Sequence, residues 1–376
     1  MNWHGNRLNE RFIYREVDFS DLSEGADIED VAGGGLDFGA FTDLKASGTL
    51  SFFGRRPDDS KLVRVYYTFT DDDGETLDPY CLGTFFVEPR DIANAYTIDG
   101  IIEQGSVDLK SVLCALNGDI LGMPQTVSEG TNAITAAISE CTAHGLKTEA
   151  QESSYTLPKD KLFDASDTYS KKVNELLSAA GFRAAMPSAQ GSVLFQDATL
   201  GTSPVFTFEA GEYSITEPKV TETSNWTDGF NCWKAYYADE DVSLYAEAVI
   251  TDGTSNSYNR IHRLKTDSLQ VDSLSGADAS TMLANLMLAV QTKAQDNTGS
   301  YEYVKFSHPW IPMELYDCAA VDFGERKWIG NLANRHIDLS VGADTSDELR
   351  RPVQGDATIH VKGIDLITGS VTEYDV

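Results

Sequence analysis

The hydrophobic pattern of the first hundred residues predicts antiparallel β-structure. Residues 44–54, LKASGTLSFFG, place Leu44, Ala46, Gly48, Leu50 and Phe52 at every second position, which is the period of a half-buried strand. Residues 62–70, LVRVYYTFT, predict another strand, since β-branched and aromatic residues are frequent there. Three more strands are expected at 11–20, 80–88 and 96–103. Strands at this spacing favour a small barrel or sandwich. Residues 20–39 are rich in Asp, Glu and Gly and are expected to form a loop.

From residue 106 the apolar spacing changes to three and four residues, which predicts helices. The expected helices are 107–116, 132–141 with a cap among 128–131, and a third that Ser166 or Asp167 caps. Gly145 and Gly181 end the second and third helices, because glycine tolerates the left-handed conformation. Short strands at 182–186 and 193–195 surround the turn-forming residues 187–191. Residues 106–200 therefore form an α/β insertion.

Beyond residue 205 the β pattern returns. A strand is expected at 205–208 with Ile215 and Val220 to follow, then a hairpin of 229–238 with 242–251, and one more strand within 263–274. Helix 277–296 carries an apolar stripe and is expected to pack on the sheet of its own domain. Later strands are expected at 301–306, 315–323, 327–332 and 336–341. Residues 343–347 connect these to two short strands within 356–373, which turn at Thr368 and Gly369.

The composition narrows the class of protein. The chain has 376 residues and a formal net charge of −30, so it lacks the clustered cations that bind phosphate. The acids are spread along the chain, and three explanations stay open: solubility, an acidic wall past which a polyanion slides, and adaptation to high salt. No apolar run approaches the roughly 20 residues that span a bilayer, and the N-terminus has no apolar signal core. We expect folding in a cytoplasm and no stable membrane insertion.

Candidate chemistry is sparse. The five cysteines form no CxxC pair, the six histidines form no metal-binding spacing, and neither a GxSxG nor a GxxxxGK[ST] motif occurs. Gly33-Gly34-Gly35 does not continue as a dinucleotide fingerprint and is interpreted as a flexible loop. His308 is expected at a bend, with a pocket position as the alternative. The sequence thus predicts no catalytic, cofactor-binding or metal-ligating residue and no cofactor.

Two other features allow a functional reading. Asp71-Asp72-Asp73-Gly74 invites comparison with a calcium loop, but Phe69 occupies a position that needs an acid, so a hairpin turn is favoured. Tryptophans could line a sugar groove, although buried packing is the alternative for most of them. The tryptophans are Trp3, Trp226, Trp233, Trp310 and Trp328.

Several stretches together resemble the hub proteins of phage tails, that is, the central baseplate or tail-tip hub family, including the N-terminal hub part of tail-associated proteins. The stretches are residues 41–54 with 82–91 and 96–113, residues 173–196, and residues 311–323, IPMELYDCAAVDF. The resemblance implies an α+β, mostly β fold with two antiparallel β-barrel domains of tube type. These are residues 1–105 and 201–342, the second carrying the helix 277–296. An inserted α/β domain, 106–200, and a C-terminal β extension, 343–376, complete the expected organisation.

The same resemblance implies a structural, non-enzymatic function in the virion tail. Three chains would present six barrels and so adapt the sixfold tail tube to a threefold fibre or spike around the DNA channel. The implied partners are the other chains of a homotrimer, the tail tube or distal tail protein, the tape measure protein, and a tip fibre or spike protein. DNA would pass without specific binding, and assembly would occur in the host cytoplasm. The alternatives are a receptor- or carbohydrate-binding tail protein and a tail glycan hydrolase.

Overall fold

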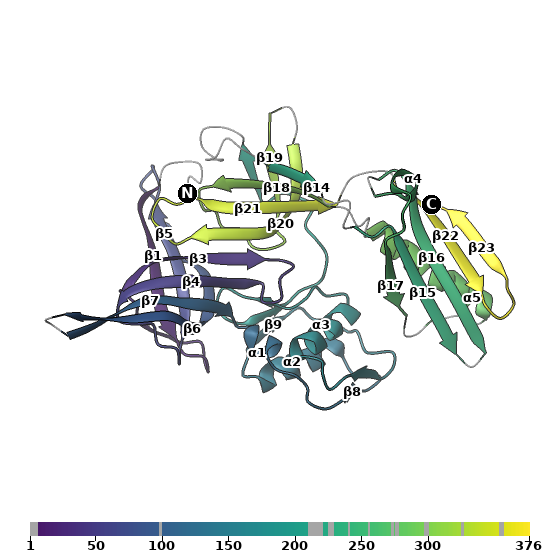
Figure 1. Cartoon of the computed structure of the whole chain (residues 1–376), viewed down its shortest axis with the longest axis horizontal. Coiled ribbons are helices and arrows are strands. Elements are labelled where there is room, and N and C mark those ends of the chain that lie inside the picture. Colours follow the sequence, from purple (N-terminus) through teal and green to yellow (C-terminus); the bar gives the residue numbers. More distant parts are fainter. Residues whose placement is uncertain are drawn as a thin grey trace. The chain divides into compact units, whose positions relative to one another are not determined.

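The computed structural model describes residues 7–97, 100–209, 221–224, 229–239, 241–254, 256–271, 274, 278–296, 301–324, 327–352 and 357–376. The chain divides into two units. Unit 1 comprises Met1–Lys219 and Lys305–Leu349, and unit 2 comprises Val220–Val304 and Arg350–Val376. Strands far outnumber helices in both units (Figure 1), so the predicted α+β, mostly β class is confirmed.

Unit 1 is built on an antiparallel sheet in the order β20-β3-β4-β7-β6-β5-β1-β2. Its strands are β1 (Leu8–Val17), β2 (Glu24–Asp27), β3 (Val31–Gly39), β4 (Ala46–Gly54), β5 (Leu62–Thr70), β6 (Tyr80–Thr97), β7 (Gly100–Ser111) and β20 (Lys327–Asp338). Strand β19 (Cys318–Asp322) pairs antiparallel with β20 and parallel with β13 (Phe206–Glu209). Unit boundaries fall within β18 (Tyr301–His308) and β21 (Thr345–Pro352). Among the described residues no pairing closes a barrel.

Two strands show how the sequence pattern becomes burial. On β4, Ala46, Leu50 and Phe52 are buried and the residues between them are more exposed, as the alternation predicts. β5 is buried on both faces over eight of its nine residues, so it carries an almost continuous apolar run. One face contributes Val63, Val65 and Tyr67 to the core of the sheet. On the other face, Arg64 donates to the carbonyl oxygen of Gln190, in the turn 187–191.

The predicted loop at 20–39 is wrong, because β2 and β3 lie there. The three glycines at 33–35 belong to β3, where a bulge follows Val31. A Cβ on Gly34 would come within 2.0 Å of the carbonyl oxygen of Thr49 on β4. Glycine is therefore required because the backbones of two strands approach closely here. The run of three glycines was interpreted as a flexible loop because the sequence does not show this approach.

The predicted helix at 107–116 is also wrong. The strand expected at 80–88 is the first half of the longer β6, but the strand expected at 96–103 is wrong, because β6 ends at Thr97 and the chain returns as β7 from Gly100 to Ser111. Val107 and Leu109 are buried two positions apart on β7, followed by the short helix α1 (Cys114–Asn117). The two-residue spacing of β7 runs directly into the single turn of α1. Together they give apolar residues at the three- and four-residue spacing of a helix.

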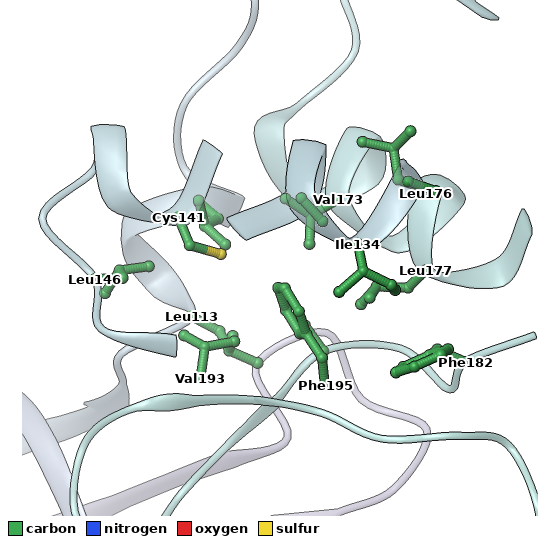
Figure 2. Close-up of a cluster of buried hydrophobic side chains, with 14 of the residues drawn as sticks. Leu113, Ile134, Cys141, Leu146, Val173, Leu176, Leu177, Phe182, Val193 and Phe195 are labelled. Carbon is green, nitrogen blue, oxygen red and sulfur yellow. The ribbon is translucent and has the colours of Figure 1, made fainter. Parts of the chain in front are cut away.

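The inserted domain surrounds its own apolar core (Figure 2). Its elements are α1, β8 (Gln125–Val127), α2 (Ala133–Ala143), β9 (Thr148–Ala150), β10 (Lys161–Phe163), α3 (Tyr169–Ala179), β11 (Met186–Pro187) and β12 (Val193–Phe195). Val173 and Leu177 of α3 point toward Phe195 and Ile134, and Leu176 belongs to the same cluster. Partly buried Phe19 and other side chains of the large sheet pack against it.

The caps of α2 and α3 differ from the prediction by one or two residues. Asn132 caps α2 by accepting from the Thr135 amide, and Thr168 caps α3 by accepting from the Lys171 amide. Gly145 and Gly181 follow the helix ends with positive φ angles of 74° and 79°, as predicted.

Unit 2 is a five-stranded sheet, in the order β17-β15-β16-β22-β23, with one long helix. Its elements are β14 (Thr221–Ser224), β15 (Cys232–Asp239), β16 (Val242–Asp252), α4 (Tyr258–Ile261), β17 (Thr266–Gln270), α5 (Ala279–Asp296), β22 (Thr358–Asp365) and β23 (Val371–Asp375). Leu286 and Val290 of α5 are buried against β15, β16 and β22, so the predicted packing of this helix is confirmed. A Cβ on Gly363 would lie 2.4 Å from the Met287 sulfur, so glycine lets helix and strand approach.

The remaining predicted strands and turns are confirmed in part. The 229–251 hairpin, the 263–274 strand and the turn at 368–369 are confirmed. The strands expected at 327–332 and 336–341 form the single strand β20, and the expected connection 343–347 contains the start of β21. Ile215 and Val220 lie outside the described residues. Of the four predicted domains, 1–105 and 106–200 both fall in unit 1, while 201–342 and 343–376 are each shared between the units. The four ranges stay a prediction.

Candidate functional site

The turn at residues 187–191 of the inserted domain lies on strands β5 and β6 of the large sheet. Arg64 is buried and donates from Nε to Thr84 Oγ1 (2.9 Å) and from Nη2 to the carbonyl oxygen of Gln190 (2.7 Å). Its Nη1 pairs with Glu24 Oε1 at 2.9 Å. Thr84 Oγ1 donates to the carbonyl oxygen of Ala189 (2.7 Å). These bonds fix the inserted domain on the sheet.

The sequence shapes this turn locally. The Ser192 amide donates to Ser188 Oγ (2.9 Å), and the two hydroxyls lie 2.6 Å apart. Gly191 has a φ of 91°, and a Cβ there would lie 3.1 Å from the Thr84 methyl carbon. The turn was predicted from its residue types, but its contact with β5 and β6 was not, since the partners are more than 100 residues apart.

Beside this contact lies a cavity of about 720 Å³ within unit 1. Its wall is formed by β6, by residues 186–196 of the inserted domain and by residues 310–315. Most of the lining is apolar, including Leu82, Phe85, Met186, Trp310 and Leu332. A concave apolar site with few polar groups is the usual form of a binding pocket.

Two charged groups that line this cavity, Lys45 and Glu314, have a shifted pKa. Lys45 Nζ donates to the carbonyl oxygen of Ala40 (2.7 Å), and burial lowers the pKa of Lys45. Burial, and then the negative charge of Asp317, raise the pKa of Glu314. These groups offer little to a charged ligand, so the cavity suits apolar groups.

A buried charged cluster stands behind the cavity. Two hydrogen bonds join Arg335 to Asp347 of β21. Arg335 Nε donates to Oδ1 (2.8 Å), and Arg335 Nη2 donates to Oδ2 (2.6 Å). His308 Nε2 lies 2.8 Å from the same Oδ2. Burial raises the pKa of Asp347, but the charges of Arg335 and His308 and their hydrogen bonds outweigh it and hold that pKa below its usual range. The carboxylate therefore stays ionised in the core.

This cluster organises the chain around Trp310 rather than reaching solvent. Arg335 Nη1 donates to the carbonyl oxygens of Ile311 (3.0 Å) and Met313 (2.7 Å), and His308 Nδ1 lies 2.7 Å from the carbonyl oxygen of Pro309. His308 thus ends strand β18 at a fully buried position. Its charged partners were missed because they lie 39 and 27 positions away, although a polar residue between apolar strand positions was a possible signal.

The turn after β5 is a hairpin turn, as predicted. Asp71 is fully buried, and its Oδ1 accepts from the amides of Asp73 (3.1 Å) and Glu75 (2.8 Å). The carboxylate that a calcium ion would need is therefore used to hold the turn. Within the described part of the chain, no group of three His, Cys, Asp or Glu side chains is placed to hold a metal ion.

The described tryptophans are packed in the interior, and Trp310 also lines the cavity. Trp233, Trp310 and Trp328 are all buried, so packing is the correct interpretation for them. Trp3 and Trp226 lie outside the described residues. The five cysteines carry free thiols, and burial raises the pKa of Cys81 to about 12. No described helix has the length and apolar character needed to cross a membrane.

Comparison by sequence finds no match among protein-family models or curated proteins. Comparison by structure does. A tail protein from Neisseria meningitidis matches with a TM-score of 0.60 at 12% identity, covering 90% of this chain and 96% of that one. The 43 kDa tail protein of prophage MuSo2 from Shewanella oneidensis matches with a TM-score of 0.57 at 12% identity, covering 91% and 97%.

The chain has the fold of these phage tail proteins. The tail-protein fold covers both units and the inserted domain, so the resemblance noted in the sequence is confirmed at the level of the fold.

Proposed function

We propose that this chain is a structural protein of a phage or phage-like tail, a homotrimeric hub at its distal end. The observation that carries the proposal is the tail-protein fold, shared over nine-tenths of the chain with two tail proteins of nearly equal length. The extent of the match is important, because it includes the inserted domain as well as both β-rich parts. The function needs no reaction, so the hub is proposed to be non-enzymatic.

In the proposed hub, three chains form a ring that adapts the sixfold tail tube to a threefold tip. Closed rings of identical chains need matched, repeated interfaces, and two β-rich parts per chain provide six from three copies. The tail tube or distal tail protein binds on one side, and a fibre or spike protein on the other. The tape measure protein and then DNA occupy the channel.

The charge of the chain supports this arrangement. A net charge of −30 gives DNA few cations to bind, so the genome passes a wall of this composition with little attachment. The rigid contact of the inserted domain with β5 and β6 suits a protein that carries load in an assembly.

The proposal is tested by the mass and symmetry of the assembled protein. We expect light scattering of the ring released from purified tails to give the mass of three chains, and electron microscopy of tails to place labelled chains at the distal end with threefold symmetry. A protein that stays monomeric and is absent from purified tails would refute the hub. Glycan binding or reducing-end release by a monomer would instead favour the recognition or hydrolase alternatives.

A further inference from the structure

The sheet of unit 2 has one face covered by α5 (Figure 1). The opposite face carries an apolar row. Four side chains stand side by side across neighbouring strands, because the register pairs Tyr236 with Tyr245, Tyr245 with Ile364, and Ile364 with Val371. The side chains at the two ends of this row, Tyr236 and Val371, are 57% and 54% exposed. Contiguous exposed apolar side chains of this kind mark interaction sites.

Two residues further along each strand, the same face carries a charged row. The register pairs Lys234 with Glu247, Glu247 with Lys362, and Lys362 with Glu373. The signs therefore alternate across four strands, and the row has no net charge. Within one chain Lys234 Nζ and Glu247 Oε2 lie 3.8 Å apart, a long contact between partly exposed groups that contributes little on its own.

The balanced charge of this face indicates which partner fits. The chain as a whole has 59 acidic and 29 basic residues, so two copies repel each other over most of their surfaces. Across the charged row this repulsion vanishes. When the row is turned end for end, as a two-fold axis turns it, Lys234 meets Glu373 of the second copy and Glu247 meets Lys362. The row is complementary to itself.

We propose that the face of the unit 2 sheet opposite α5 binds the same face of a second copy of this chain. The apolar row forms the centre of the contact and the charged row its electrostatic border, which is the usual anatomy of an interface. The contact is isologous and gives a dimer of the isolated chain. It rests on the two rows alone and does not depend on the hub proposal.

The test uses two full-length variants with complementary faces. One carries Lys234→Glu with Lys362→Glu, and the other Glu247→Lys with Glu373→Lys. Each variant places like charges opposite each other in its own dimer, so we expect self-association about tenfold weaker or more in sedimentation equilibrium. Mixed in equal amounts, the two variants restore the dimer, because every Lys again meets a Glu.

A matched control carries Glu129→Lys with Glu152→Lys, two exposed acids of the inserted domain, and gives the same change in net charge as the Glu247→Lys with Glu373→Lys variant. It is expected to associate at least as strongly as the wild type. Circular dichroism establishes that the variants remain folded. A monomeric wild type, undiminished self-association of both variants, or failure of the mixture to pair would overturn the proposal. A stable trimer in which both variants behave as wild type would overturn it while leaving the hub intact.

Discussion

The large sheet of unit 1 and the five-stranded sheet of unit 2 differ in what covers their faces. In unit 1, the face of β5 and β6 is covered by the turn 187–191, and Arg64 is buried there with three hydrogen-bonded partners. In unit 2, the face opposite α5 leaves Lys234 and Lys362 partly exposed beside glutamates. A buried charge must be paired within the fold because its desolvation is costly, whereas an exposed charge stays hydrated and can pair with a group of another molecule. The face of β5 and β6 is thus covered by the chain's own turn, whereas the face opposite α5 is the one proposed to bind a second copy.

The largest effect is expected where burial is complete. Asp347→Asn removes the negative charge that compensates Arg335 and His308 in the core, so the free energy of unfolding of unit 1 should fall by about 3–5 kcal/mol. Chemical denaturation measures this loss. The neighbouring change Glu348→Gln is the control, because a glutamine can still accept the bond from Asn334. It should cost no more than about 0.5 kcal/mol. Equal losses in both variants would contradict the assignment.

An intermediate effect is expected at the covered face. Arg64→Met keeps an apolar stem but removes the bonds to Thr84, Gln190 and Glu24, at a cost of about 2–3 kcal/mol. Hydrogen exchange at residues 188–191 should accelerate, because the turn loses the bond from Arg64 to the carbonyl oxygen of Gln190. Lys362→Met on the uncovered face of unit 2 is the matched control and should change stability by about 0.5 kcal/mol or less. Unaltered exchange at the turn in Arg64→Met would show that Arg64 does not hold the inserted domain.

The smallest effect concerns pH at the edge of the covered face. The hydroxyl of Tyr66 and then, against the opposing effect of burial, Arg15 and Arg64 lower the pKa of Glu24 from 4.5 to about 2. A lowered folded-state pKa means that Glu24 contributes stability above its unfolded pKa and loses it as pH falls through the folded one. The stability difference between wild type and Glu24→Gln should therefore shrink as pH is lowered from about 5 to about 2. Urea unfolding across that range measures it, and a constant difference would refute it.

Local sequence patterns predicted the elements whose burial follows from their own spacing. Strand β5 was predicted from its β-branched and aromatic residues, and the stripe of α5 from apolar residues at helical spacing. Local composition failed at β3, where glycines serve a close approach to Thr49 that only the paired strand reveals. It failed again at β7, where two periods meet.

The candidate sites depend on pairing that no local pattern contains. Asp347, Arg335 and His308 come from three strands, and their mutual bonds exist only once β18, β20 and β21 are in place. The rows on the sheet of unit 2 likewise depend on register, since a shift of one residue in β16 would move Tyr245 and Glu247 to the α5 face. Charges are visible in a sequence, but the order in which they stand across a sheet is not.

The attachments of the inserted domain limit how it can move. Its first end follows Ser111, whose hydroxyl donates to the carbonyl oxygen of Leu44, and its last end is tied where Asn331 Nδ2 donates to the carbonyl oxygen of Gly201 (3.0 Å). A body joined at two points can still swing about the line between them. The turn on β5 and β6 supplies a third point and removes that axis. The inserted domain is therefore held on the large sheet at both of its ends and at the turn 187–191.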